Sequence, residues 1–353
     1  MIKRHFAYLA CAAAVVGTGI GAAPPLESSK THVVRPGQSI QKAVDAARPG
    51  DTVLLSPGTY HESVRVTTSG LTLRGTGKRP VVIRPATTKA ANSCAQAGNG
   101  ICVEGTSSRP VEGTTITGLI LTGFAKNGLW ASHTDRLTVR RVTAEKNGQW
   151  GIAQQRSVRG LFTYNTARNN GDAGVFLANT VTEEGGATDS LGAVVARNRL
   201  EGNRIGLTVR RLRNMTVAYN HATGNCAAVF VVGDETPPRA GALTVRDNRI
   251  LANNKHCPKT PRLPFLQGSG IVLTGAEDTL VTRNEVADNK GTSPLSGGVV
   301  LFKSMVGAKN ERNRITDNTL RNNSPADLVN ADTAKNNTFQ GNTCTVSKPA
   351  GLC

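Results

Sequence analysis

The chain has 353 residues, and its 42 lysines and arginines outnumber its 24 aspartates and glutamates, which gives a formal net charge of +18. Such a charge favours acidic partners. Aromatic residues make up only 4% of the chain and no nucleic-acid-binding motif is visible, which argues against nucleic acid. We therefore expect an acidic polysaccharide or an anionic cell wall as the partner, with the alternative that the cations only keep the surface solvated.

The N-terminus has the pattern of a secretory signal peptide. The basic start Lys3-Arg4-His5 precedes an apolar run at 6–16, and small residues follow at 21–23. A run of this length is too short to span a membrane. We therefore expect a secreted, monomeric protein without a transmembrane segment, divided into a signal peptide at 1–23, a polar leader at 24–31 and one domain at 32–353.

One short amphipathic helix is predicted directly after the leader. Ser39 fits an N-cap, apolar residues recur at helical spacing from Ile40 to Ala47, and Arg48-Pro49-Gly50 ends the helix. Short alternating strands broken by Pro and Gly follow at 51–83. A helix in front of stacked strands is typical of a cap over the open end of a solenoid.

The rest of the chain repeats a pair of asparagines in the frame Asn-x-apolar-x-x-Asn. A repeat of about 22 residues with insertions predicts a solenoid, and strands of four or five residues favour β-coils over helical repeats. Asn tolerates the left-handed backbone of tight corners, and its amide can bind the next Asn along the stack, so we assign these residues a structural role. Seven copies span 165–170, 198–203, 220–225, 248–253, 284–289, 318–323 and 337–342.

Six cysteines remain once a signal peptide containing Cys11 is removed. An even number of cysteines in an exported chain indicates disulfides. Zinc binding is the alternative, but no spacing has the Cys-x2-Cys pattern. We predict the pairs Cys94–Cys102, Cys226–Cys257 and Cys344–Cys353.

The run PGQSIQKAVDAARPGDTVLLSPGTYHESV, with LTLRGTG and the Asn repeats after it, resembles the secreted right-handed parallel β-helix proteins of the pectate-lyase-like superfamily. The resemblance implies an all-β, single-stranded right-handed parallel β-helix of roughly 10–11 coils with an N-terminal capping helix. It implies no single reaction, because the superfamily includes lyases, glycoside hydrolases, epimerases and proteins with no known reaction. The Asn-Thr-Asp, Asp-Asp and Gly-His-Gly signatures of the polygalacturonase-like hydrolases, and the Tyr-Gly and Asp-Pro-His-Asp stretch of the mannuronan epimerases, are absent.

Each coil has a second strand that opens at Gly or its equivalent, and alternation along it points Trp130, Phe176 and Phe230 away from the interior. This apolar column is either a stacking surface for sugar rings or is covered by the insertions. The insertions fall at 179–192, 233–241, 254–268 and 304–312.

Five residues past each strand opening, one column contains His133, Arg156, Asn179, Arg211, Gly233, Gly275 and Lys303. The coil of Arg211 has no insertion and lies between two acidic loops, which predicts a cleft with Arg211 in its floor. Such a cleft suits β-elimination of a uronic-acid polymer, a reaction that needs a neutralised carboxylate, a base and an acid. The alternative is that the loop carboxylates only pair with nearby arginines.

On this hypothesis the protein is a polysaccharide lyase-like enzyme, and the alternative is a non-catalytic polysaccharide- or cell-surface-binding protein. Phe302-Lys303-Ser304 also resembles the Lys-Ser of the chondroitinase-B-like alginate lyases, without their Asn-Gly-x-Glu motif. Tyr219 and His221 beside an Asn repeat form either a rival site or a surface ladder. We assign catalysis to Arg211, His133, Tyr164 and Lys303, substrate binding to Trp130, Arg156, Phe176, Arg210, Arg213 and Phe230, and a possible Ca²⁺ site to Glu183, Glu184, Asp189, Asp234 and Glu235.

Overall fold

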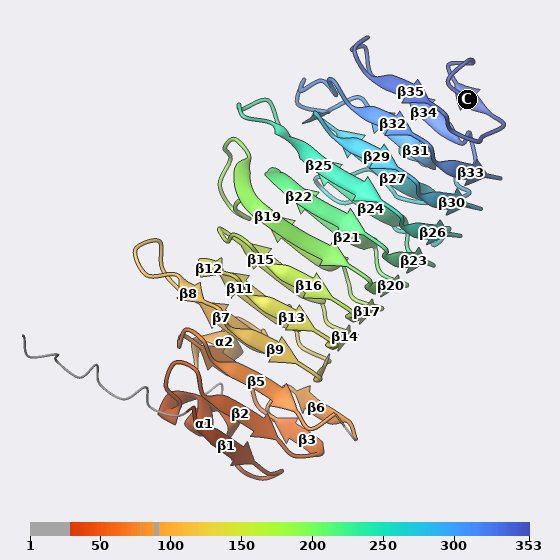
Figure 1. The fold of residues 1–353 in the computed structure, drawn as a ribbon. Helices are drawn as coiled ribbons and strands as arrows, with labels where there is room; N and C mark the ends of the chain where they lie inside the picture. The colour runs from red at the N-terminus through yellow and green to blue at the C-terminus, as the bar shows by residue number, and fades with distance from the viewer. Residues whose placement is uncertain (1–28, 78, 88–91) are drawn as a thin grey trace, which may run out of the picture.

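The computed structural model describes residues 29–77, 79–87 and 92–353, which form a parallel β-helix built on three long sheets (Figure 1). The predicted signal peptide at 1–23 and most of the leader at 24–31 lie outside these residues. No helix among the described residues is both long and apolar enough to cross a membrane.

Sheet A runs the length of the solenoid, and every strand pair in it is parallel. After β1 its described strands mark eleven coils, within the predicted range. In spatial order they are β1 (Thr31–Val34), β2 (Thr52–Leu55), β5 (Thr72–Gly75), β9 (Thr115–Thr117), β13 (Thr138–Arg140), β16 (Leu161–Thr163), β19 (Thr188–Ala196), β22 (Leu212–Ala218), β25 (Ala240–Arg246), β29 (Leu280–Thr282), β32 (Arg314–Thr316) and β35 (Thr338–Gln340), with β28 (Ala276–Glu277) beside β25.

Sheets B and C complete each coil. Sheet B contains β3 (Gly58–His61), β6 (Val81–Arg84), β10 (Ile120–Thr122), β14 (Thr143–Glu145), β17 (Thr166–Arg168), β20 (Arg199–Glu201), β23 (His221–Thr223), β26 (Arg249–Leu251), β30 (Glu285–Ala287) and β33 (Thr319–Arg321). Sheet C contains β4 (Val64–Val66), β7 (Ile101–Glu104), β11 (Leu129–Ser132), β15 (Ile152–Gln155), β18 (Ala173–Ala178), β21 (Ile205–Arg210), β24 (Ala227–Val232), β27 (Ser269–Thr274), β31 (Gly297–Phe302), β34 (Leu328–Asn330) and β36 (Ser347–Lys348). A separate pair joins β8 (Val111–Glu112) to β12 (Thr134–Asp135).

The predicted capping helix is α1 (Ile40–Ala46), which packs against β1, β2 and β4. Ser39 is its N-cap, since the hydroxyl of Ser39 accepts a hydrogen bond from the amide of Lys42. Ile40 and Val44 are buried under the helix. A second short helix, α2 (Ser93–Gln96), was not predicted and precedes β7.

Alternation along the short strands fills the interior with one continuous apolar core. Equivalent side chains stack above one another, as Val139, Phe162 and Val195 do in sheet A, and all three are fully buried. Fully burying an aliphatic or aromatic side chain contributes about 1.5–3 kcal/mol. The coils are therefore held together mainly by this stack.

Two internal ladders of asparagine confirm the structural role predicted for the repeat. In most steps one Asn donates from its backbone amide and its side-chain amide to the side-chain oxygen of the next, as Asn198 does to Asn220 at 3.0 and 2.9 Å. The copy at 337–342 has a different phase from the other six, because Asn337 continues the ladder of Asn313 across β35 of sheet A. The other copies cross strands of sheet B, as 165–170 does with β17.

The apolar column on the outside of sheet C is covered, which decides between the two alternatives for it. Phe176 and Phe230 are 7% and 3% exposed, so the predicted role of both rings in substrate binding is wrong. They belong to a second apolar cluster closed by Leu266 of the insertion at 254–268. Only Trp130 is partly exposed, at the end of a stack with Trp150 and Phe176.

All three predicted disulfides are present, and one of them ties the cover of this cluster to the solenoid. That bond joins Cys257 of the insertion to Cys226, which directly precedes β24. The bond from Cys94 to Cys102 links α2 to β7. The remaining bond joins Cys344 to Cys353.

Candidate functional site

The predicted column of site residues lies where the strands of sheet C end. Register pairs Ser132 with Gln155, so the residues that follow them, His133 and Arg156, occupy equivalent corners, and Arg211 lies two coils beyond Arg156. These three corner residues have left-handed backbones, with φ of 52°, 48° and 53°. At these corners their side chains lie at the edge between sheets C and A, where the longer loops emerge.

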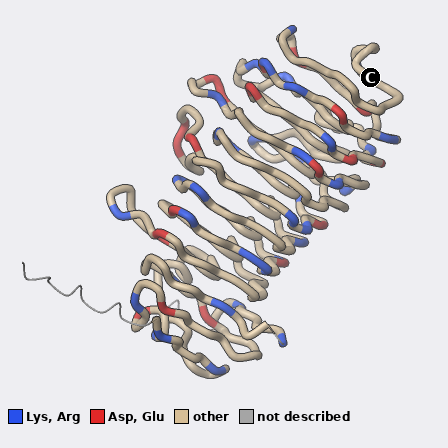
Figure 2. Tube along the Cα trace, in the orientation of Figure 1, with Lys and Arg blue, Asp and Glu red and all other residues tan. Residues whose placement is uncertain are grey.

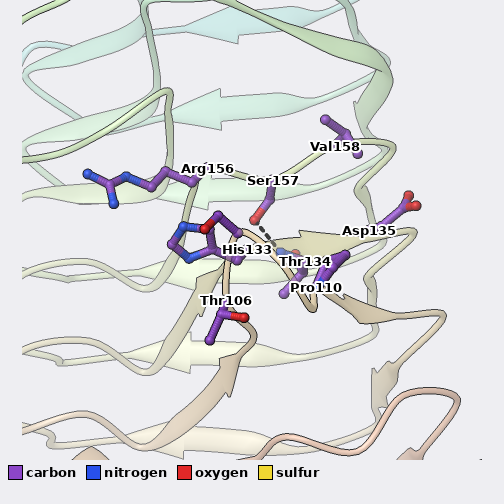
Figure 3. Close-up of a pocket in the computed structure, with 9 residues that line it drawn as sticks. Thr106, Pro110, His133, Thr134, Asp135, Arg156, Ser157 and Val158 are labelled. Carbon is purple, nitrogen blue, oxygen red and sulfur yellow. Dashed lines mark hydrogen bonds between the residues drawn. The ribbon is translucent and has the colours of Figure 1, made fainter.

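A pocket of about 290 Å³ opens at this edge over His133 and Arg156 (Figure 3). The two coils that form its floor have short corners. The loop at 105–110 projects on one side and the loop at 179–187 on the other, as Figure 1 shows ahead of β8 and β19. The pocket is lined by Thr106, Ser107, Pro110, His133, Thr134, Asp135, Arg156, Ser157 and Val158.

His133 is held by a chain of polar side chains behind it. The hydroxyl oxygen of Ser132 lies 3.0 Å from Nδ1 of His133 and accepts a hydrogen bond from the amide of Gln155 at 3.3 Å. With Nδ1–H as donor to Ser132, the lone pair of Nε2 is free, and Nε2 has no hydrogen-bond partner among the described residues. Burial, and then the charge of Arg156, lower the pKa of His133 below its ordinary value of 6.5. The imidazole is therefore neutral at neutral pH.

Arg156 supplies a positive charge at the same pocket. Its guanidinium is 36% exposed and forms an ion pair with Glu183, a residue of the neighbouring loop that is 65% exposed. An exposed pair of this kind contributes about 0.2–1 kcal/mol. A negatively charged ligand can therefore compete with Glu183 for the guanidinium at small cost.

Asp135 lies on the opposite side of the pocket from Arg156 (Figure 3), and its negative charge is balanced by two arginines. Arg159 binds both of its carboxylate oxygens, and Arg136 lies 3.2 Å away. The hydrogen bond from Arg159 is the main reason that the pKa of Asp135 is lowered. Asp135 is therefore a fixed anion of the pocket wall and is unsuited to donate a proton.

The cleft predicted over Arg211 is closed. The side chain of Arg211 is 2% exposed, and its Nη1 lies 3.1 Å from Glu184 and 3.2 Å from Asp234, one residue from each flanking loop. The two loops also bind each other, since the amide of Ala187 donates to the carbonyl of Pro238 at 2.6 Å. The two loops predicted to flank Arg211 do contact it, but they also contact each other and cover its side chain. The expectation that Arg211 forms the floor of an open cleft is therefore wrong.

Three further predicted basic residues and the predicted Tyr164 also lie away from the pocket. Arg210 donates to the carbonyl of Val181 at 3.0 Å, and Arg213 to that of Arg239 at 2.7 Å, so both support loops. Lys303 follows β31, several coils along the same edge. Tyr164 lies at the corner between sheets A and B, on the other side of the coil, and is 47% exposed.

The five carboxylates predicted as a Ca²⁺ site are bound by different partners. Glu183 pairs with Arg156, whereas Glu184 and Asp234 pair with Arg211. Asp189 accepts from Asn214 at 3.0 Å, and Glu235 lies exposed on the second loop. No group of three or more His, Cys, Asp or Glu that could hold a metal ion occurs in the described part of the chain.

Several residues of the pocket were not predicted from the sequence. Thr106 and Ser107 come from a loop between Gly105 and Val111 that the repeat frame does not reach. The polar run before Pro110 was the available signal, because it lengthens the corner of one early coil. Ser157 and Asp135 lack such a signal, since they are ordinary corner residues of short coils.

Comparison with protein-family models matches residues 70–250 and 238–353 to the right handed beta helix region. The chain belongs to the right-handed β-helix family. None of the curated proteins compared with this sequence matches it. The predicted handedness and fold are thus confirmed for this β-helix protein.

Solved structures share the fold of this β-helix protein at low identity. The A-module of mannuronan C-5 epimerase AlgE4 of Azotobacter vinelandii superposes with a TM-score of 0.56 at 18% identity, covering 86% of this chain and 90% of that chain. DFA-IIIase from Arthrobacter chlorophenolicus A6, in complex with GF2, has a TM-score of 0.53 at 13% identity, with 88% and 92% covered. The Dettilon tailspike protein gp208 has a TM-score of 0.54 at 12% identity, with 88% and 67% covered. At these identities the likeness concerns the fold.

Proposed function

We propose that this protein is a secreted enzyme that cleaves a uronate-containing polysaccharide by β-elimination at the His133 pocket. The observation that carries the proposal is a neutral, partly buried imidazole beside an accessible guanidinium in the pocket between two loops. These are the two groups that removal of a proton next to a carboxylate requires, namely a base and a fixed positive charge.

The reaction uses each group at a defined atom. The guanidinium of Arg156 binds the C6 carboxylate of the uronate and stabilises the negative charge that develops there. Nε2 of His133 takes the C5 proton, the electron pair forms the C4–C5 double bond, and the bond from C4 to the glycosidic oxygen breaks. The imidazolium then returns its proton to the leaving oxygen. Atoms and charges balance without any other reactant.

Hydrolysis suits the pocket less well. It commonly needs two carboxyl groups, one of which is protonated. Among the described lining residues Asp135 is the one carboxylate, and Arg159 and Arg136 keep it ionised. Glu183 at the rim is paired with Arg156.

The likeness in fold to an enzyme named as a mannuronan C-5 epimerase supports a carbohydrate substrate, because that name places a reaction at C5 of a sugar polymer. Secretion is supported by the three disulfides, which form in oxidising compartments. The formal charge of +18 supports an acidic polymer over a neutral one.

The test is the appearance of the unsaturated uronate, followed by ultraviolet absorbance. Purified mature protein is mixed with pectate, alginate, hyaluronan, chondroitin or heparan, each with and without added Ca²⁺. We expect absorbance to rise on one of these polymers and to be lost in His133→Ala. His61→Ala is the matched control, since His61 is an exposed histidine of sheet B.

Two outcomes would overturn the proposal. Flat traces on all five polymers, together with salt-sensitive binding to one of them, would show a polysaccharide-binding protein without turnover. A rise in absorbance that His133→Ala leaves unchanged would place the reaction elsewhere on the molecule. The dependence on Ca²⁺ would decide whether a metal assists Arg156.

A further inference from the structure

Five exposed or partly exposed side chains form a continuous stack along the corner between sheets A and B. We name Arg140, Tyr164, Arg197, Tyr219 and Arg246 the Arg–Tyr ladder. Each residue ends, or directly follows, a strand of sheet A, in the order β13, β16, β19, β22 and β25. Neighbouring strands lie about 4.8 Å apart, so the ladder follows the long axis of the solenoid.

Guanidinium groups and phenol rings alternate in contact along this stack. Arg140 and Arg197 lie 5.2 and 5.7 Å from the ring centroid of Tyr164. Arg197 and Arg246 both lie 5.1 Å from that of Tyr219. Each ring is 47% exposed. Such cation–π contacts contribute about 0.5–1 kcal/mol each at exposed sites, which is enough to align side chains that would otherwise be mobile.

The ladder carries positive charge that the protein does not neutralise. Arg140, Arg197 and the neighbouring Arg141 form no ion pair with any described residue. Only the last member, Arg246, has a carboxylate partner, Asp247. Figure 2 shows Lys and Arg recurring where the strands of sheet A reach this corner.

Arginines one strand further along the chain, on sheet B, behave differently. Arg168 pairs with Glu145 and Arg199 pairs with Glu201, both at 2.6 Å. The surface of this protein therefore supplies carboxylates to its arginines a few residues away from the ladder. Arg140 and Arg197 differ from these two arginines, because neither has a carboxylate partner among the described residues.

From these contacts we propose that the Arg–Tyr ladder is a binding track for an acidic polysaccharide, separate from the His133 pocket. The rings contact the faces of the guanidinium groups and leave the edge donors of Arg140 and Arg197 for carboxylate or sulfate groups. Arg246, in contrast, donates to the Tyr219 hydroxyl and to Asp247. The linear spacing of the arginines suits a chain that carries repeated anions. The inference does not rest on the proposed reaction, because binding to the ladder needs no turnover.

Nucleic acid fits the ladder less well. Single strands bind proteins by stacking their bases on exposed aromatic faces. Here the arginines from the coils before and after cover Tyr164 and Tyr219, so the faces of the rings are occupied. The hydroxyl of Tyr164 and the guanidinium edges of Arg140 and Arg197 are suited to anions and sugar hydroxyls, whereas the Tyr219 hydroxyl accepts from Arg246 at 2.8 Å.

The ladder and the pocket lie at opposite ends of the sheet A strands. The His133 corner precedes β13, whereas Arg140 ends that strand. A long polymer bound at the ladder would raise the local concentration of its own chain at the pocket. The track would therefore hold a polymer or a cell wall while the pocket works on it.

The experiment compares Arg197→Ala with Arg199→Ala in binding to pectate, alginate and heparan, measured by calorimetry at low and high salt. Arg197 touches both rings, whereas Arg199 carries the same charge two residues away and is paired with Glu201. We expect Arg197→Ala to weaken binding about tenfold at low salt, the size of one lost charge-assisted contact, and Arg199→Ala to change it less than about twofold.

Further variants separate the alternatives. Arg197→Lys keeps the charge without the planar fork and is expected to bind between wild type and Arg197→Ala. His133→Ala is expected to keep full binding at the ladder, so a failed reaction and a failed ladder are distinguishable. Equal losses in Arg197→Ala and Arg199→Ala would overturn the proposal in favour of unspecific charge. Tighter binding of single-stranded DNA, lost in Arg197→Ala, would overturn the polysaccharide as its ligand.

Discussion

Two corners of the same edge, two coils apart, show how this solenoid separates chemistry from support. At one, Arg156 is 36% exposed and lies beside the neutral His133 in an open pocket. At the other, Arg211 is 2% exposed and joins Glu184 to Asp234 under two loops. Both arginines have left-handed backbones at the same register position.

Arg156 and Arg211 differ in exposure because the loop at 179–187 packs against the loop on its C-terminal side. The loop at 179–187 contacts the loop at 233–239 through Ala187 and Pro238, and it encloses Arg211 between them. Toward the N-terminus its Asn179 carbonyl accepts from the backbone amide of Arg156 at 2.9 Å, and the Arg156 side chain forms an ion pair with the exposed Glu183. One side of the loop therefore seals a corner and the other side forms the wall of a pocket. In a solenoid the same residue at the same corner serves structure or function according to its neighbouring loops.

Replacement of Arg211 by alanine is expected to have the largest effect on stability. It removes one partner of a buried ion pair, which leaves the Asp234 carboxylate without its cation and the carbonyl of Glu183 without its donor. Breaking a buried pair in this way costs about 3–5 kcal/mol. Urea denaturation of Arg211→Ala measures the loss, with Arg156→Ala as the exposed counterpart, for which we expect less than about 1 kcal/mol. A stable Arg211→Ala protein without turnover would instead make Arg211 catalytic.

The next effect concerns turnover at the open corner. Arg156→Ala removes the positive charge that stabilises the developing carboxylate charge, and the loss of one such preorganised group costs about 100-fold in kcat. Initial rates on the polymer that the protein cleaves measure this loss. The matched control is Arg168→Ala, which removes an arginine paired with Glu145 on sheet B and is expected to keep the wild-type rate. Equal losses of kcat in Arg156→Ala and Arg168→Ala would contradict a specific role of Arg156 in the reaction.

The fold could be predicted in detail because its main internal bonds repeat. An amide ladder needs Asn at the same place in each coil, since Asn220 must accept from Asn198 and donate to Asn248. A repeated requirement leaves a repeated sequence. The phase of the last copy was harder, because Asn318 both ends one frame, from Asn313, and begins another.

The site could be predicted only in part. Counting along the strands placed His133, Arg156 and Arg211 in one column, and the register confirms it. Which corner stays open depends on contacts between loops that are far apart in sequence, such as the hydrogen bond from Ala187 to Pro238. No local sequence pattern predicts which neighbouring loop a loop will pack against. The sequence therefore indicated the edge of the solenoid that carries the pocket but placed the cleft two coils too far.

A pH profile tests the state of His133 at the open corner. Its pKa is lowered by burial and by Arg156, and the base must be neutral to accept a proton. The value of kcat/KM is therefore expected to rise about tenfold per pH unit on the acid side, with the midpoint of this limb below the ordinary histidine pKa of 6.5. Arg156→Ala removes one cause of the shift, so the acid limb should move to higher pH. An acid limb at the same pH in wild type and Arg156→Ala would show that Arg156 does not affect the group that titrates.

The smallest effect is expected at the contact that links the loop to the open corner. Glu183→Gln removes the carboxylate that competes with substrate for Arg156. An exposed pair contributes about 0.2–1 kcal/mol, so KM should fall by up to about fivefold while kcat is unchanged. Glu145→Gln, which releases Arg168 on sheet B, should leave KM unchanged. A rise in KM in Glu183→Gln would contradict this competition. It would mean that the carboxylate of Glu183 holds Arg156 in position for the substrate, so that the loop at 179–187 takes part in substrate binding.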